Sequence, residues 1–125
     1  MLKVTGIAFT IFNFKDVART RAFYGQTLGL TPCAEMEFAP GTWWLEYDTG
    51  EGALALTNYP MPGLSAGPSP GVALEVTNFD EALAGLRAAG VPLAWGPNDF
   101  PVCRSLAIVD PDGNAIYLHQ RKPTA

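Results

Sequence analysis

The chain has 125 residues, 48% of them hydrophobic and 16% charged, with a formal net charge of −4. This length suits one domain with a core of its own, and the composition excludes a disordered chain. The eight Lys and Arg residues are scattered, so they do not make the basic surface that nucleic acid requires. No apolar run approaches the roughly 20 residues that cross a bilayer, and no leader-like segment opens the sequence. We therefore expect a cytoplasmic protein with no nucleic-acid or membrane partner.

The first half of the chain is predicted to fold as β-α-β-β-β. Residues 7–14 form an apolar run rich in β-branched and aromatic side chains, which indicates a strand. Asp16 can cap a helix over 17–28, which Gly29 ends. Three further segments have strand character, and turn residues join the last two: 31–38, 43–48 and 53–58.

A segment rich in proline and glycine follows at 59–70. Its four prolines and two glycines exclude a central strand or a helix. We interpret it as the linker between two halves. A lid over a binding site is the alternative, because long irregular loops often border sites.

The second half repeats the pattern of the first. A strand at 71–77 is followed by a helix at 79–89, which Asn78 caps. The remaining strands are predicted at 91–95, 103–109 and 115–120. A shift of 62 positions places Asp16 on Asn78 and Asp48 on Asp110, so the two halves are internal repeats. The sequence thus predicts a single domain, 1–125, of two modules, 1–58 and 71–125, joined by the linker 59–70.

Several short motifs occur in a fixed order along the chain. Asp16, Phe23-Tyr24 and Leu28-Gly29-Leu30 form a "D…FY…LGL" pattern, and residues 110–114 read DPDGN. In these motifs and in its two halves, the chain resembles the vicinal oxygen chelate superfamily of glyoxalases, bleomycin-resistance proteins and extradiol dioxygenases. The resemblance implies an α+β fold in which two β-α-β-β-β modules form a curved eight-stranded mixed sheet around a cavity. It also implies a homodimer, since family members often pair their modules across subunits.

The family resemblance also locates four positions that usually hold a metal. Enzymes of the family carry His, Glu or Gln there and use a divalent metal as a Lewis acid. The matching positions in this sequence contain none of these residue types, and a shift of one residue does not supply them: Phe9, Ala55, Gly71 and Tyr117. The single histidine, His119, lies two residues beyond the fourth position, whereas a catalytic metal needs about three protein ligands. The resemblance therefore implies a member without a catalytic metal or other cofactor.

Strand alternation predicts which side chains face the cavity. Starting from Phe9, every second residue of the first strand faces inward, and the same rule applies to the strands of the second half. The predicted ligand-binding residues, hairpin strands included, are Phe9, Ile11, Asn13, Trp44, Glu46, Glu75, Arg104, Tyr117 and His119.

For Trp44, Glu46 and Arg104 this prediction depends on the register of the two hairpins. A four-residue loop at 49–52 places Trp44 and Glu46 on the cavity face, and the matching turn in the second half places Arg104 there. A slip of one residue would reverse the faces of either hairpin strand. The sequence leaves both registers open.

The predicted wall is aromatic and aliphatic with a few polar groups, which is the usual make-up of a small-molecule site. We interpret the chain as a protein that sequesters a small molecule, aromatic or cationic, without making a bond. The alternative is a metal-free or degenerate enzyme of lyase or isomerase type, with an acid or base among Glu75, Tyr117 and His119, although the sequence assigns no catalytic residue. A third interpretation is a filled core in which Glu46, Glu75 and Arg104 neutralise one another.

Overall fold

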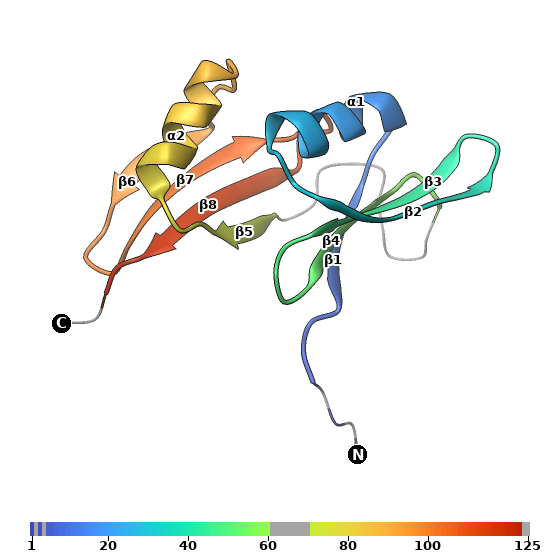
Figure 1. The fold of residues 1–125 in the computed structure, drawn as a ribbon, viewed down its shortest axis with the longest axis horizontal. Helices are drawn as coiled ribbons and strands as arrows, with labels where there is room; N and C mark the ends of the chain where they lie inside the picture. The colour runs from blue at the N-terminus through green and yellow to red at the C-terminus, as the bar shows by residue number, and fades with distance from the viewer. Residues whose placement is uncertain (2, 4, 61–70, 124–125) are drawn as a thin grey trace. The chain divides into compact units, whose positions relative to one another are not determined.

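The computed structural model describes residues 1, 3, 5–60 and 71–123, and the chain divides into two compact units, 1–66 and 67–125 (Figure 1). Most of the predicted linker, 61–70, lies outside the described residues. The first unit contains β1 (Phe9–Asn13), α1 (Val17–Arg21), η1 (Ala22–Thr27), β2 (Pro32–Ala39), β3 (Thr42–Asp48) and β4 (Ala53–Thr57). The second contains β5 (Val72–Glu75), α2 (Phe79–Ala88), β6 (Trp95–Asp99), β7 (Cys103–Val109) and β8 (Ala115–Arg121).

Each unit has one four-stranded mixed sheet with the same topology. In the first, which we call sheet A, the strand order is β1-β4-β3-β2. In the second, sheet B, the order is β5-β8-β7-β6. The first and last strands of each module pair in parallel, and the other pairs are antiparallel. The predicted α+β class and the two β-α-β-β-β modules are confirmed, but the eight strands form two sheets where the prediction joined them in one.

The helix of the first unit begins as predicted and changes its winding halfway. The Asp16 side chain caps α1 by accepting a hydrogen bond of 2.9 Å from the backbone N–H of Arg19. From Ala22 the winding is that of a π-helix, in which Leu28 N–H donates to the carbonyl of Phe23, five residues back. Thr20 and Tyr24 are buried, and Val17 and Leu28 are partly buried.

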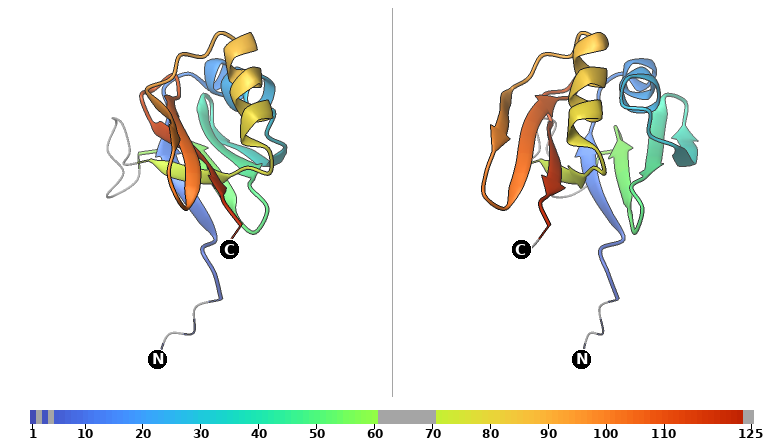
Figure 2. Two further views of the ribbon diagram at one scale, coloured as in Figure 1. Left: turned by 90° about the vertical axis from the view of Figure 1, so that its left-hand side faces the viewer. Right: turned by 60° about the vertical axis from the view of Figure 1, so that its left-hand side comes forward.

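Helix α2 packs against strand β8 of sheet B, as both views in Figure 2 show. Asn78 caps it through a hydrogen bond from Glu81 N–H, as predicted, and the Gln120 side chain accepts another from Phe79 N–H. Its apolar face is buried through Phe79, Leu83 and Leu86. No helix among the described residues is long and apolar enough to span a membrane.

The core of the first unit lies between its helix and one face of sheet A. Tyr24 of η1 stacks on Tyr47 of β3, with ring centroids 5.7 Å apart, and both side chains are buried. Burial raises the pKa of Tyr47, and the nearby Glu35 carboxylate raises it further. The remaining side chains of this layer are Phe12, Leu45, Leu54 and Leu56.

The two hairpin turns differ by one residue, and this difference sets the faces of the strands. In the first, Asp48 pairs with Ala53, so the loop has four residues. In the second, the pairing starts at Val109 and Ala115, so the loop has five residues, the DPDGN motif. An odd change in loop length exchanges the two faces of one strand relative to its partner.

The Asp110 carboxylate holds this five-residue loop together. The side chain is buried and accepts hydrogen bonds of 2.9 and 2.8 Å from the backbone N–H groups of Asp112 and Asn114. The Asn114 side-chain amide, also buried, donates a third bond of 2.8 Å. The motif is therefore a structural turn in which Asp and Asn satisfy each other.

The predicted strand 91–95 is wrong in position, since β6 begins only at Trp95. Val91 N–H still donates to the Leu86 carbonyl, as part of the end of α2. Gly96 has φ +81, and a Cβ there would lie 2.9 Å from the Ser105 carbonyl oxygen. The strand is therefore irregular at its start, and because it lies at the edge of sheet B it tolerates Pro97.

Replacement of Asn114 by Ala is expected to lower the free energy of unfolding by about 1.5–3 kcal/mol, because it removes a hydrogen bond to a buried carboxylate. Urea unfolding followed by circular dichroism measures the change. Glu51→Ala, in the exposed loop of the first hairpin, is the control and should alter stability by less than about 0.5 kcal/mol. Equal effects of the two substitutions would show that the Asp110–Asn114 pair does not stabilise the turn.

Candidate functional site

The face of sheet A opposite its helix, which we call open face A, gathers the predicted site residues of the first unit. On β1 this face carries Phe9, Ile11 and Asn13, since the buried Phe12 points the other way. On β3 it carries Trp44 and Glu46, because Glu46 pairs with Ala55, which itself pairs with Ile11. The predicted register of the first hairpin is confirmed. The structure thus brings together the five predicted residues of this half.

Phe9 and Trp44 form an aromatic pair on open face A. Their ring centroids are 5.3 Å apart and the ring planes lie at 84°, the edge-to-face arrangement that aromatic rings favour. Phe9 is 42% exposed and Trp44 is partly exposed. The pair therefore presents aromatic surface that the core does not use.

The polar residues of open face A differ in how they are engaged. The Asn13 side-chain amide donates a hydrogen bond of 3.2 Å to the Thr57 carbonyl and so fastens the end of β1 to β4. The Glu46 side chain is partly buried, and no described residue gives its carboxylate a hydrogen bond or an ion pair. A partly buried carboxylate without a partner can bind a cation or a donor group.

The corresponding open face B of sheet B carries Glu75, Tyr117 and His119. The parallel pairing of β5 with β8 places Glu75 opposite His119 and Ala73 opposite Tyr117. The ring of Tyr117 meets that of Trp95 from β6 edge to face, with centroids 6.0 Å apart. Trp95 is 43% exposed.

Glu75 and His119 form a close pair. The distance between His119 Nδ1 and Glu75 Oε1 is 2.6 Å, and the backbone N–H of Arg121 donates to Glu75 Oε2 at 2.7 Å. The Arg121 N–H, followed by the His119 hydrogen bond, holds the pKa of the Glu75 carboxyl below its usual range. The sequence named both residues but contained no sign of an oriented pair, because it did not fix the register between β5 and β8.

Arg104 does not share a face with Tyr117, so this part of the prediction is wrong. It pairs with Gln120, and its guanidinium bonds Asp80 at 2.8 Å and lies over the Phe79 ring at 4.5 Å. The five-residue DPDGN loop is the cause, since it turns Arg104 toward α2. Arg104 therefore fastens the helix to sheet B.

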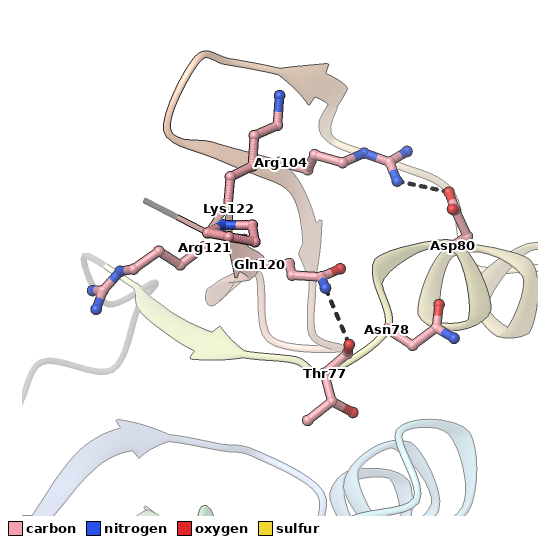
Figure 3. A pocket seen from close by; sticks show the side chains of 8 residues that line it. Thr77, Asn78, Asp80, Arg104, Gln120, Arg121 and Lys122 are labelled. Atoms are coloured by element: carbon pink, nitrogen blue, oxygen red, sulfur yellow. Dashed lines mark hydrogen bonds and ion pairs between the residues drawn. The ribbon is translucent and has the colours of Figure 1, made fainter. Parts of the chain in front are cut away.

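A shallow pocket of the second unit lies around Arg104 on the helix side of the sheet (Figure 3). Its side chains are engaged with one another: Arg104 bonds Asp80, and the Gln120 amide donates 3.1 Å to the Thr77 carbonyl. Lys122 pairs with Asp99. Apart from Arg104 it contains none of the predicted ligand-binding residues, and of the residues assigned to open face B it includes only Arg121.

Two of the four positions that the sequence comparison marked, Gly71 and Tyr117, lie against each other in the second unit. Gly71 has φ +118, and a Cβ there would lie 3.2 Å from Tyr117 Cε2 and 3.0 Å from the Ala115 carbonyl oxygen. The Tyr117 ring thus fills the space that a side chain at position 71 would need. Across residues 5–60 and 71–123, no three His, Cys, Asp or Glu side chains group together as a metal site.

Comparison with known proteins places the chain in a family. The sequence profile of the Glyoxalase/Bleomycin resistance protein/Dioxygenase superfamily matches residues 6–118. A search of curated proteins finds no significant match.

Three solved structures illustrate the shared fold. TnmS3, an antibiotic binding protein from Streptomyces sp. CB03234, is 22% identical, with a TM-score of 0.81 over 98% of this chain and 100% of that one. A glyoxalase/bleomycin resistance protein from the same strain is 28% identical, with a TM-score of 0.79 over 92% of this chain and 100% of that one. Lactoylglutathione lyase from Agrobacterium tumefaciens is 20% identical, with a TM-score of 0.78 over 94% of this chain and 95% of that one. By its profile match and its fold, the chain belongs to the Glyoxalase/Bleomycin resistance protein/Dioxygenase superfamily.

Proposed function

We propose that the protein binds a small planar molecule, aromatic or cationic, and sequesters it without a metal and without making a bond. The observation that carries the proposal is the Phe9–Trp44 pair on open face A, exposed beside the unpaired Glu46 carboxylate. The similarity in fold to an antibiotic binding protein supports it.

The aromatic pair supplies a contact surface for a flat ligand. Stacking on a rigid ring removes apolar area from water at small cost in side-chain entropy, which is why aromatic residues often anchor ligands. Phe9 meets Trp44 at 84°, so it limits the rotation of the indole and leaves the exposed part of each ring for the ligand. Neither ring belongs to the layer that packs beneath the helix.

Glu46 gives this face a preference for positive groups. Its carboxylate lies on the strand that carries Trp44, two residues along the same face. A cation held over the indole face is attracted by the ring as well as by the carboxylate. A planar aromatic cation therefore satisfies both features at once.

Removal of the Trp44 ring tests the anchor. In calorimetric titrations with planar aromatic molecules, each used as a cationic and a neutral analogue, Trp44→Ala should weaken binding by roughly 1–3 kcal/mol. Trp43→Ala is the matched control, because Trp43 lies on the opposite face under the Arg21 guanidinium.

Glu46→Gln should weaken binding of the cationic analogue more than binding of the neutral analogue, since the substitution removes the charge and keeps the shape of the side chain.

The filled-core interpretation predicts a different result for the same variants. Trp44→Ala would then lower the melting temperature sharply, as large-to-small core substitutions do. In that case no molecule of the panel would raise the melting temperature of the unsubstituted protein. Equal losses of binding in the Trp43 and Trp44 variants would also contradict the proposal.

The proposed binding does not depend on a metal. The residue types at Phe9, Ala55, Gly71 and Tyr117 lead us to expect less than stoichiometric zinc, nickel, iron or manganese by elemental analysis after dialysis. One tightly held metal per chain would contradict this part of the proposal.

We also propose that the protein is a homodimer. The edge strands are β1 and β2 in sheet A and β5 and β6 in sheet B, and no other described strand pairs with their outer edges. Such edges tend to be covered. Light scattering at micromolar concentration should give twice the 13.4 kDa of one chain. A mass of one chain throughout that range would contradict the dimer.

A further inference from the structure

We propose that Glu75 and His119 form a general base on open face B, placed to take a proton from a planar substrate beside Trp95 and Tyr117. This goes beyond sequestration, because a bond to hydrogen is broken. It rests on the residues of sheet B alone and does not require that open face A bind anything.

The hydrogen bonds of Glu75 fix the orientation of the imidazole. Both carboxylate oxygens are engaged, Oε1 with His119 Nδ1 at 2.6 Å and Oε2 with Arg121 N–H at 2.7 Å. The carboxylate is thereby anchored to the backbone of β8, the strand that carries the histidine. An ionised carboxylate can only accept, so Nδ1 donates to it, and in the neutral ring Nε2 then keeps its lone pair.

The imidazole of His119 is partly exposed. The His119 side chain is 30% exposed, and no described residue forms a hydrogen bond with Nε2. On neighbouring strands of open face B, His119 pairs with Ser105 of β7 as well as with Glu75 of β5. The pair is therefore a base with an orienting group behind it, the arrangement that general-base catalysis uses.

The surroundings select a flat substrate. Across sheet B, Ala73, Tyr117, Ala107 and Trp95 lie opposite one another in a row that neighbours the row of Glu75 and His119. Two large rings thus rise above alanines, and both are exposed, Trp95 by 43% and Tyr117 by 37%. Such a surface fits a planar conjugated molecule whose acidic hydrogen points toward the imidazole.

The reaction class that follows is proton abstraction from a carbon next to an electron-withdrawing conjugated group. Nε2 takes the proton, and the electron pair of the C–H bond stays with the substrate, where it forms a new π bond. The substrate then either takes a proton at another atom, which is an isomerisation, or expels a leaving group, which is an elimination. The imidazolium is stabilised by the Glu75 carboxylate until it returns the proton to the product or to water.

The test uses 5-nitrobenzisoxazole, a planar molecule that a base opens in one step. The base removes the hydrogen on carbon 3, the C–H electron pair completes a C≡N bond, and the N–O bond breaks to give a coloured phenolate. The protein should accelerate this reaction roughly 10²-fold or more over free imidazole at equal concentration and pH. His119→Gln removes the catalytic base and should abolish this acceleration over free imidazole. If His119→Gln does not fold, His119→Asn carries the same expectation.

Glu75 acts through His119 as a positioning residue, which gives it a distinct signature. Glu75→Gln should lower kcat roughly tenfold or more with KM changed less than about twofold. The other titratable groups on this face are unchanged in the variant: Cys103, Tyr117 and Arg121.

The tautomer of the single histidine gives a readout independent of activity. Long-range proton–nitrogen NMR correlations should show the neutral ring of the unsubstituted protein protonated at Nδ1, and Glu75→Gln should shift the proton toward Nε2.

Glu35→Gln is the matched control. It removes an exposed carboxylate paired with Arg21 on the helix side of sheet A and should change neither the rate nor the tautomer. No acceleration over imidazole, acceleration that survives in the His119 variants, or a ring protonated at Nε2 in the unsubstituted protein would overturn the proposal, whatever the outcome for open face A.

Discussion

A strand presents successive side chains to its two opposite faces, and each sheet of this protein is covered by one helix on one face. Everything that distinguishes core from candidate site follows from which residues the strands turn toward that helix. In sheet A the choice places Leu45 and Tyr47 beneath η1 and leaves Trp44 and Glu46 on the other face. Since the side-chain period is two, one residue more in a loop exchanges these sets.

The length of the DPDGN loop decides which side chains of β7 face the helix. Its five residues are held by the buried Asp110–Asn114 bonds, whereas the first hairpin closes with four. Arg104 is consequently turned toward Asp80 of α2. The equivalent position in the first module, by contrast, lies on open face A. The two modules are thus related in topology but differ in which hairpin residues they leave uncovered.

The sequence was sufficient where local chemistry decides the outcome. Caps at Asp16 and Asn78 place the helix starts, and turn residues locate the hairpins, although they did not give the register of the second. It was insufficient where the outcome depends on partners distant in the chain. The start of β6 depends on the close approach of Gly96 to the Ser105 carbonyl, and the pairing of Glu75 with His119 depends on a parallel register that no turn defines. For the same reason Glu75 and His119 could be named individually, but the hydrogen bond between them could not be predicted.

The two open faces offer different chemistry within one small fold. Open face A combines exposed aromatic rings with an unpaired carboxylate, which suits capture of a flat cation. Open face B combines rings with a carboxylate already committed to orienting an imidazole, which suits proton transfer. Each face also carries an exposed aromatic ring, Phe9 on open face A and Tyr117 on open face B.

Native mass spectrometry of the gently purified protein tests this account most directly. The account predicts an organic adduct of small-molecule mass on the intact chain, which is absent from the Trp44→Ala variant and retained in the Trp43→Ala variant. A mass increment equal to one divalent metal ion per chain, in place of an organic adduct, would contradict it.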